Sequence, residues 1–269
     1  MKIITFSAIK GGVGKTTLTY NFGSWLKYQG KKVLYIDLDH QCNLTQTFNI
    51  FENKGTVADI FIPKNEVNII KIDTHISIIP GYMRLDDIEK NISTQSNKDM
   101  LFYMWLEDNY QKMNINEYDF ILIDTHPDFS TITKNAIAIS HTVFSPVTPS
   151  EHGFSSRDIL IERFNEFKNE MVDFKTRESY ITADLFFIAN MVKHNTKSSK
   201  EFMKLIPKID DVIAVIPNKE LFNNTTLEKK SITEMSLITS QYNKHKKFFD
   251  NYHEININLL NHIKLRKEQ

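Results

Sequence analysis

The chain has 269 residues, 41% of them hydrophobic, which is enough for an ordinary globular core. Its 33 basic and 33 acidic residues cancel, so the composition does not indicate a globally basic nucleic-acid binder. A single cysteine, Cys42, excludes an intrachain disulfide and a cysteine-based metal or iron–sulfur centre within one chain.

Apolar runs along the chain predict strands that alternate with helices. Residues 3–8 form a β-prone run that ends in glycines, and helical spacing follows from Thr16 to Leu26. Further apolar runs predict strands at Val33–Asp37, Ile76–Ile79, Phe120–Asp124, Thr142–Pro146, Leu185–Ala189 and Val212–Ile216. Helical spacing recurs over Ser156–Phe167 and Lys197–Ile206. This alternation predicts an α/β fold with a doubly wound, mostly parallel sheet and helices on both faces.

The chain has no internal repeat, low-complexity tract or Pro/Ser-rich linker. This organisation predicts that residues 1–269 form a single domain. Residues 50–115 are rich in Asn, Lys and Asp and lack strong strands, so we expect helical insertions over one edge of the sheet. A C-terminal helical region is expected over 231–265.

A glycine-rich segment between the first strand and the first helix predicts a phosphate-binding loop. Its glycines let backbone N–H groups turn towards an anion at the N-terminus of the helix. Lys15 can reach the terminal phosphates, and the hydroxyl of Thr16 can bind Mg²⁺. Ile9 stands where a strict Walker A motif has its first glycine. The predicted loop comprises Lys10, Gly11, Gly12, Val13, Gly14, Lys15, Thr16 and Thr17.

Acidic residues end two of the predicted strands. Asp37 and Asp39 close the second strand, and strand alternation points both carboxylates towards the carboxyl edge of the sheet, where ligands of open α/β sheets bind. Asp124 ends the apolar strand Phe120–Asp124, as the acid of a Walker B strand does. We therefore expect these acids near a bound Mg²⁺.

These motifs together resemble the deviant Walker A ATPases of the ParA/MinD superfamily, and in particular ParA-type partition ATPases. The resemblance implies a P-loop NTPase fold, with ATP and Mg²⁺ as cofactors and hydrolysis of ATP to ADP and phosphate. It implies catalytic roles for Lys10, Lys15 and Asp39, in which Lys10 reaches across an ATP-bound homodimer and Asp39 helps place the attacking water. Thr16, Asp39 and Asp124 are the implied metal-site residues.

The chain departs from the family pattern at several positions in these motifs. His40 stands where the family usually has proline, and Cys42 where glycine is common. Thr125-His126-Pro127 resembles the family's T-P-P with one proline replaced. We therefore expect the backbone of the loop after Asp39 to differ from that of relatives.

The adenine is expected at the ends of later strands. Asn190 follows the strand Leu185–Ala189, and Pro217 follows Val212–Ile216, at positions that the family places beside the base. The alternative is that both residues serve only as ordinary turns at strand ends.

The implied function is DNA segregation. ParA proteins bind non-specific DNA as ATP-bound dimers, and hydrolysis stimulated by a ParB-type centromere-binding partner releases them. Residues 191–269 hold 14 Lys and Arg against nine Asp and Glu, which fits a phosphate-contacting surface or, alternatively, a solvated helix face. The lysines in question are Lys193, Lys197, Lys200, Lys219, Lys229, Lys230, Lys244, Lys246 and Lys247. We expect a cytoplasmic protein that is nucleoid-associated when ATP-bound.

Two other functions stay open at this stage. MinD-like positioning ATPases reach membranes through a C-terminal amphipathic helix, and an apolar stripe does run along the tail, at Phe248, Tyr252, Ile255, Leu259 and Ile263. Because its opposite face is not rich in Lys and Arg, we expect the stripe to pack on the domain, without stable membrane association. A small-molecule kinase could use the same loop.

The first strand begins at residue 2, so a short form without an N-terminal helix-turn-helix domain is expected.

Overall fold

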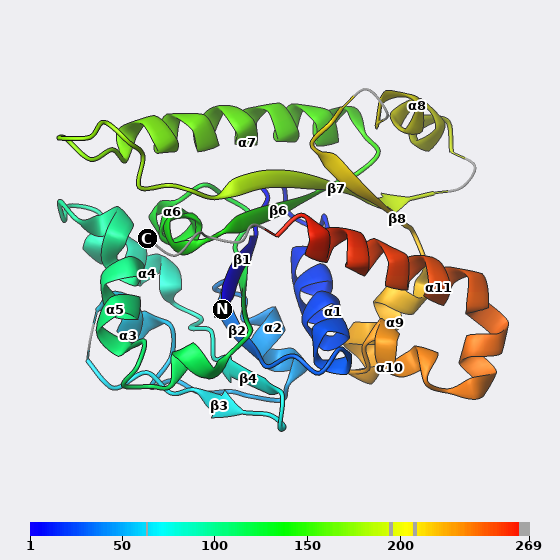
Figure 1. Ribbon diagram of the computed structural model, residues 1–269, viewed down its shortest axis with the longest axis horizontal. Coiled ribbons are helices and arrows are strands. Elements are labelled where there is room, and N and C mark those ends of the chain that lie inside the picture. The colour runs from blue at the N-terminus through cyan, green and yellow to red at the C-terminus, as the bar shows by residue number, and fades with distance from the viewer. Residues whose placement is uncertain (63, 194–195, 207–208, 264–269) are drawn as a thin grey trace.

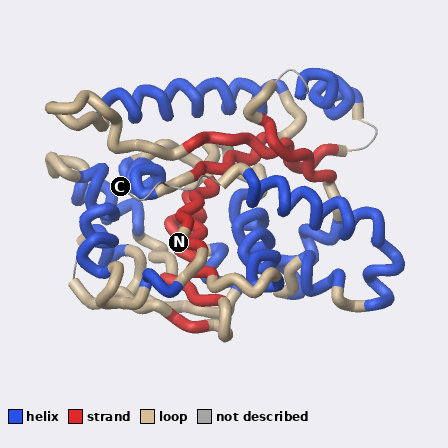
Figure 2. The backbone as a smooth tube through the Cα atoms, viewed as in Figure 1, coloured by secondary structure: helices blue, strands red, loops and turns tan. Residues whose placement is uncertain are grey.

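A computed structural model describes residues 1–62, 64–193, 196–206 and 209–263 (Figure 1). Eight strands form one continuous sheet in the order β3-β4-β2-β5-β1-β6-β7-β8 (Figure 2). The strands are β1 (Lys2–Phe6), β2 (Val33–Leu38), β3 (Ile70–Lys71), β4 (Ile76–Ile79), β5 (Phe120–Thr125), β6 (Thr142–Val147), β7 (Asp184–Val192) and β8 (Val212–Pro217). Every neighbouring pair is parallel except β3 and β4, which confirms the predicted α/β fold.

Helices cover both faces of this sheet. In Figure 1 the sheet lies between one group of helices, α1 and α9–α11, and another group, α3–α7. They are α1 (Lys15–Tyr28), α2 (Asn43–Thr47), α3 (Ala58–Phe61), α4 (Leu85–Ile92), α5 (Leu101–Asn109), α6 (Thr131–Ile139), α7 (Glu151–Glu170), α8 (Lys197–Leu205), α9 (Glu220–Glu228), α10 (Ile232–Ser236) and α11 (Thr239–Asn261), with 3₁₀ turns η1 (Lys98–Met100) and η2 (Ile115–Glu117). Because both faces are covered, the central strands β2 and β5 are buried along their whole length.

Helix α1 packs closely on the central strands and so fixes the position of the preceding loop relative to the sheet. Phe22 and Trp25 of α1 are buried against the sheet and stack on each other, with ring planes 12° apart. A Cβ atom at Gly23 would collide with Tyr35 of β2, so a glycine lets the helix approach the strand. The hydroxyl of Tyr35 then donates to the carbonyl of Tyr20 at 2.7 Å. Truncating a buried aromatic of this kind costs about 3–5 kcal/mol.

The C-terminal helix α11 lies against the same face of the sheet. All five residues of its predicted apolar stripe are buried. Ile255 and Leu259 belong to the core beside α1, and Phe248 and Tyr252 pack with α9 and α10. The helix ends at Asn261, and residues 264–265 of the expected region lie outside the described residues. None of the helices in the described part of the chain is long and apolar enough to cross a membrane.

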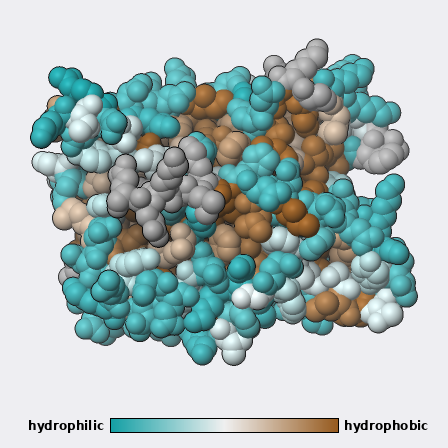
Figure 3. Space-filling view, in the orientation of Figure 1, coloured by the Kyte–Doolittle hydropathy of each residue, from teal (hydrophilic) through white to brown (hydrophobic). Residues whose placement is uncertain are grey.

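Residues 50–115 contain more than the expected helices. Helices α3, α4 and α5 pack with α6 over β2, β1 and β5. The segment also contributes the predicted strand β4 and, in addition, the short antiparallel strand β3. Strand β3 could not be predicted, because two residues carry too little pattern to indicate a strand. Where α7 and α11 flank β7 and β8, Figure 3 shows hydrophobic surface between the two helices.

Candidate nucleotide-binding site

The glycine-rich segment forms a loop between β1 and α1, as the motif predicts. Gly12 and Gly14 have φ angles of 71° and 93°, which L-residues rarely adopt, and α1 begins directly after Gly14. The amide of Asn190, on β7, donates to the carbonyl of Val13 at 2.8 Å. A Cβ atom at Gly14 would lie only 2.5 Å from this amide nitrogen. Asn190 therefore supports the loop from β7 through this hydrogen bond.

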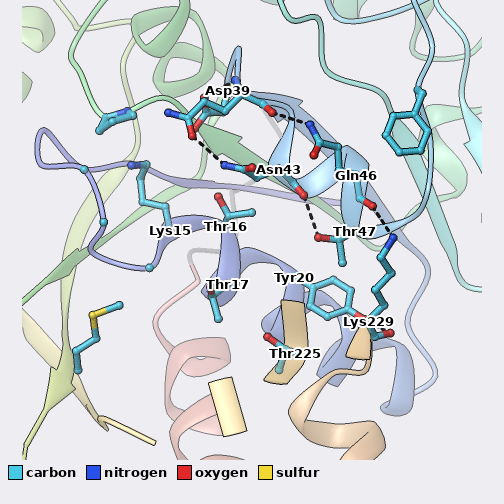
Figure 4. Close-up of a pocket in the computed structure, with 17 residues that line it drawn as sticks. Lys15, Thr16, Thr17, Tyr20, Asp39, Asn43, Gln46, Thr47, Thr225 and Lys229 are labelled. Atoms are coloured by element: carbon cyan, nitrogen blue, oxygen red, sulfur yellow. Dashed lines mark hydrogen bonds between the residues drawn. The ribbon is translucent and has the colours of Figure 1, made fainter. Parts of the chain in front are cut away.

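Lys15 is the buried cation of the site, with 6% of its surface exposed. Burial lowers its pKa, while the carboxylates of Asp124, Asp39 and Asp128 act in the opposite direction. Figure 4 shows its side chain extending from the start of α1 towards the end of the cleft where Asp39 lies. The ammonium group is therefore held among acids, where an incoming phosphate would compete for it.

Asp124, the penultimate residue of β5, lies beside the loop and is completely buried. Burial raises its pKa well above the ordinary carboxyl value, the nearby Asp37 adds to this, and Thr16 and Lys15 oppose it. Its Oδ1 lies 3.5 Å from the hydroxyl of Thr19, but Oδ2 accepts no hydrogen bond from any described residue. A buried oxygen without a partner is costly, and beside the Thr16 hydroxyl it fits a hard cation such as Mg²⁺.

Asp37 and Asp39 have different partners, although strand alternation predicts a common direction for them. Asp37 is opposite Asp124 in the β2–β5 register, and its Oδ2 accepts from the N–H and hydroxyl of Thr45 at 2.8 and 2.7 Å. Burial raises the pKa of Asp37 to about 6, although these hydrogen bonds and that from the N–H of Asp39 lower it. Asp37 thus anchors α2 to the sheet, and Asp39 is left to face the cleft.

The loop after Asp39 is held by local hydrogen bonds. Oδ1 of Asp39 accepts from the N–H of Gln41 at 2.9 Å, and its carbonyl accepts from the N–H of Cys42 at 2.8 Å. Cys42 has a φ of 53°, in the left-handed region that favours glycine. Cys42 therefore holds, with a side chain, a backbone conformation that glycine adopts without steric cost.

A cleft of about 640 Å³ opens beside these groups. Of the predicted site residues, those that line it are Gly11, Gly12, Gly14, Lys15, Thr16, Thr17 and Asp39. Lys10 is partly exposed outside the lining, Val13 and Asp124 are buried behind it, and neither Asn190 nor Pro217 lines it. Pro217 instead pairs with Val192 at the end of β8.

The residues at the far end of the cleft were not predicted as part of the nucleotide site. Tyr20, Thr225 and Lys229 face it there, opposite Gln46 and Thr47 of α2 (Figure 4). Lys229 reaches the carbonyl of Gln46 at 3.2 Å and also contacts the side chain of Asn49. Tyr20 could have been found from its helical spacing of four residues after Thr16, but no local signal places α9 beside it.

The arrangement is that of a nucleotide-binding P-loop protein, with a glycine loop and buried lysine at one end of a cleft and acids at the ends of two adjacent parallel strands. A family model described as an AAA domain matches residues 1–177. The chain is 26% identical to the chromosome-partitioning ATPase Soj of Treponema pallidum, covering 76% of this chain and 77% of that protein. It is 26% identical to a ParA family protein of Mycoplasma pneumoniae, covering 97% and 98%.

Among solved structures, a proposed plasmid partition protein of Borrelia burgdorferi B31 bound to AMPPNP has a TM-score of 0.74. It is 26% identical, and the match covers 97% of this chain and 98% of that one. The chain belongs to this AAA-domain family and, within it, to the ParA-type partition ATPases of the deviant Walker A superfamily.

Proposed function

We propose that the protein hydrolyses ATP to ADP and phosphate in a Mg²⁺-dependent reaction and uses this cycle to segregate DNA. The observation that carries the proposal is the grouping of Lys15, Asp39 and Asp124 around one end of a cleft large enough for a nucleotide. The membership of this chain in the ParA-type partition ATPases supports the same function.

The chain's own residues divide the work at the phosphate end. The N–H groups of the glycine loop and the start of α1 bind the phosphates, and Lys15 neutralises their charge. Asp39 orients the attacking water. Thr16 and Asp124 would hold Mg²⁺, with Asp39 nearby, and the bound ion would neutralise charge on the transferring phosphoryl group. The orphaned Oδ2 of Asp124 supports this assignment.

The base end is proposed to lie among Tyr20, Thr225 and Lys229. Asn190 acts beneath the loop, through the carbonyl of Val13, so its contribution to nucleotide affinity is indirect. Pro217 would then influence the base only through the end of β8.

Dimerisation is proposed to depend on Lys10. This lysine is partly exposed at the mouth of the loop and does not line the chain's own cleft. A second subunit facing the cleft would place its Lys10 against the bound nucleotide, where a cation supplied in trans stabilises developing negative charge.

The ATP-bound dimer is proposed to bind non-specific DNA, to associate with the nucleoid, and to release when a ParB-type partner stimulates hydrolysis. All nine candidate lysines of residues 191–269 are exposed. Lys229 lines the nucleotide cleft and contacts Gln46. The other eight are therefore the lysines proposed to contact DNA phosphates. The membrane-associated alternative is less favoured, because the apolar stripe of α11 is already buried in the fold.

Co-sedimentation with non-specific duplex DNA tests this cycle, in ATP, in ADP and without nucleotide, at two salt concentrations. We expect salt-sensitive binding in ATP alone. Asp39→Ala should retain the bound state because hydrolysis stalls, and Lys10→Ala should lose it because the dimer cannot close.

Lys31→Ala is the matched control, since Lys31 is an exposed lysine in the turn after the far end of α1. It should behave as the wild type does. Binding that is equal in all three nucleotide states, or absent in all of them, would contradict the proposal.

A further inference from the structure

Two histidines meet beside Asp39, although they lie far apart in the sequence. His40 follows β2 and His126 follows β5, and their rings are 4.1 Å apart between centroids and tilted by 32°. Each stands at a position where the sequence departs from the family pattern. Because β2 and β5 are paired in register, the loops after them are brought to the same place on the sheet edge.

Among the described residues, Asp39, His40 and His126 form a group able to hold a metal ion. One ligand atom from each lies within 4.8 Å of the other two. Asp39 is buried but lines the cleft, and both histidines are partly exposed. In a tetrahedral zinc site the ligand atoms lie roughly 3.3 Å apart, given bonds of about 2.0–2.1 Å. Rotation of the three side chains would bring their ligand atoms from within 4.8 Å of one another to this shorter spacing.

His126 is already oriented by a second carboxylate. Its Nδ1 lies 3.0 Å from Oδ2 of Asp128, which leaves Nε2 as the free ligand nitrogen. Asp128 is itself held, because its Oδ1 accepts from the hydroxyl of Thr133 at 2.8 Å and from the N–H of Ser130 at 3.2 Å. Carboxylate–histidine–metal chains of this kind fix the ring and strengthen the ligand.

We propose that Asp39, His40 and His126 form a binding site for a first-row transition-metal ion such as Zn²⁺, next to the Mg²⁺ site at Thr16 and Asp124. Imidazole nitrogens favour such ions over Mg²⁺, which prefers oxygen ligands. Three protein ligands leave a fourth position for water or a phosphate oxygen. Asp39 is shared between the two sites, so occupancy by Zn²⁺ would remove it from the attacking water and inhibit hydrolysis. Only this last consequence rests on the proposed function.

The site is tested by titrating Zn²⁺ into the untagged full chain without nucleotide, with equilibrium dialysis and metal analysis. We expect one ion per chain, retained in a large excess of Mg²⁺. His40→Gln and His126→Gln should each weaken binding at least tenfold. Asp128→Asn, which changes a positioning residue, should weaken it by about 10–100-fold. Co²⁺ should give visible absorption in the wild type that both histidine variants lose.

His75→Gln is the matched control, because His75 lies in the turn before β4, at the far end of β2 from this site. It should bind Zn²⁺ as the wild type does. Equal binding by the wild type and the His40→Gln/His126→Gln double variant, with circular dichroism showing both folded, would overturn the site.

The inhibitory role is tested separately by ATP hydrolysis at fixed Mg²⁺ with and without Zn²⁺. We expect at least a tenfold fall in the wild-type rate and a smaller fall in the double variant. Zn²⁺ binding without inhibition would overturn only the inhibitory role. If neither protein hydrolyses ATP, the proposed function fails, while the titration result stands by itself.

Discussion

The carboxyl ends of β2 and β5 and those of β7 and β8 lie on opposite sides of β1 and its loop, and they are organised differently. On the first side, Asp37 and Asp124 are neighbours in an unbroken parallel register, and hydrogen bonds and Lys15 offset their charge. On the second, the β7–β8 register shifts on both sides of Ala189, and Met191 has a φ of 56°. The first side places charge, whereas the second side places one amide, that of Asn190, beneath the loop. The charged groups of the site thus come from one half of the sheet, and the side chain that supports the phosphate loop comes from the other half.

The largest effect is expected where the two sides meet, at Gly14. Gly14→Ala should lower the free energy of unfolding by about 3 kcal/mol, because the positive φ and the contact with Asn190 both oppose a Cβ atom. Gly12→Ala has a similar φ but open space around it, so its cost should be about 1 kcal/mol. Urea denaturation measures both.

A double-mutant cycle isolates the support from β7. If Asn190 is the obstacle, the combination of Gly14→Ala with Asn190→Ala should be less destabilising than the sum of the two single changes. Strict additivity would show that the two sides of the loop are independent.

The β7–β8 side can be weakened away from the loop, through the ion pair of Arg157 with Asp211. Arg157 donates from Nε and NH2 to both carboxylate oxygens, at 3.2 and 2.5 Å, and its guanidinium lies 5.1 Å from the ring centre of Phe187. Arg157→Lys keeps the positive charge but loses the planar guanidinium group that donates two hydrogen bonds. We therefore expect the free energy of unfolding, measured by thermal unfolding, to fall by about 2 kcal/mol. Arg163→Lys, on an exposed position of the same helix, is the control and should leave the melting temperature unchanged.

The smallest effect is expected beyond β2, at Asp73 in the turn between β3 and β4. Partial burial raises the pKa of Asp73, but the hydrogen bond from Lys27 and the N–H groups of His75 and Ile76 bring it below the ordinary value. Stability from a lowered carboxyl pKa is present above the unfolded-state pKa and is lost as the pH falls through the folded-state pKa.

Asp73→Asn should therefore cost about 1 kcal/mol at neutral pH, where the ion pair with Lys27 is intact. In urea denaturation at several pH values, the difference from the wild type should shrink in acid. A constant difference across that range would assign the effect to the backbone contacts of the turn instead of its charge. Asp87→Asn, on the exposed face of α4, provides the comparison.

Much of this architecture could be predicted from local pattern. The six strand predictions after the first fall on β2 and β4–β8, and the loop lies where the strand–glycine–helix order indicates. What could not be predicted depends on pairing between distant segments. Asp37 and Asp39 look equivalent in the sequence, and only the position of Thr45 assigns one to structure and leaves the other to the cleft.

The sequence by itself determined the class of fold, the phosphate loop and the acids at the strand ends, because each is encoded within a few consecutive residues whose chemistry is local. The tertiary structure alone decided that Asn190 supports the loop, that Tyr20, Thr225 and Lys229 share the far end of the cleft, and that His40 meets His126. These contacts join residues from different strands and helices, and the order in which strands pair in a sheet is not written in any single segment of the chain.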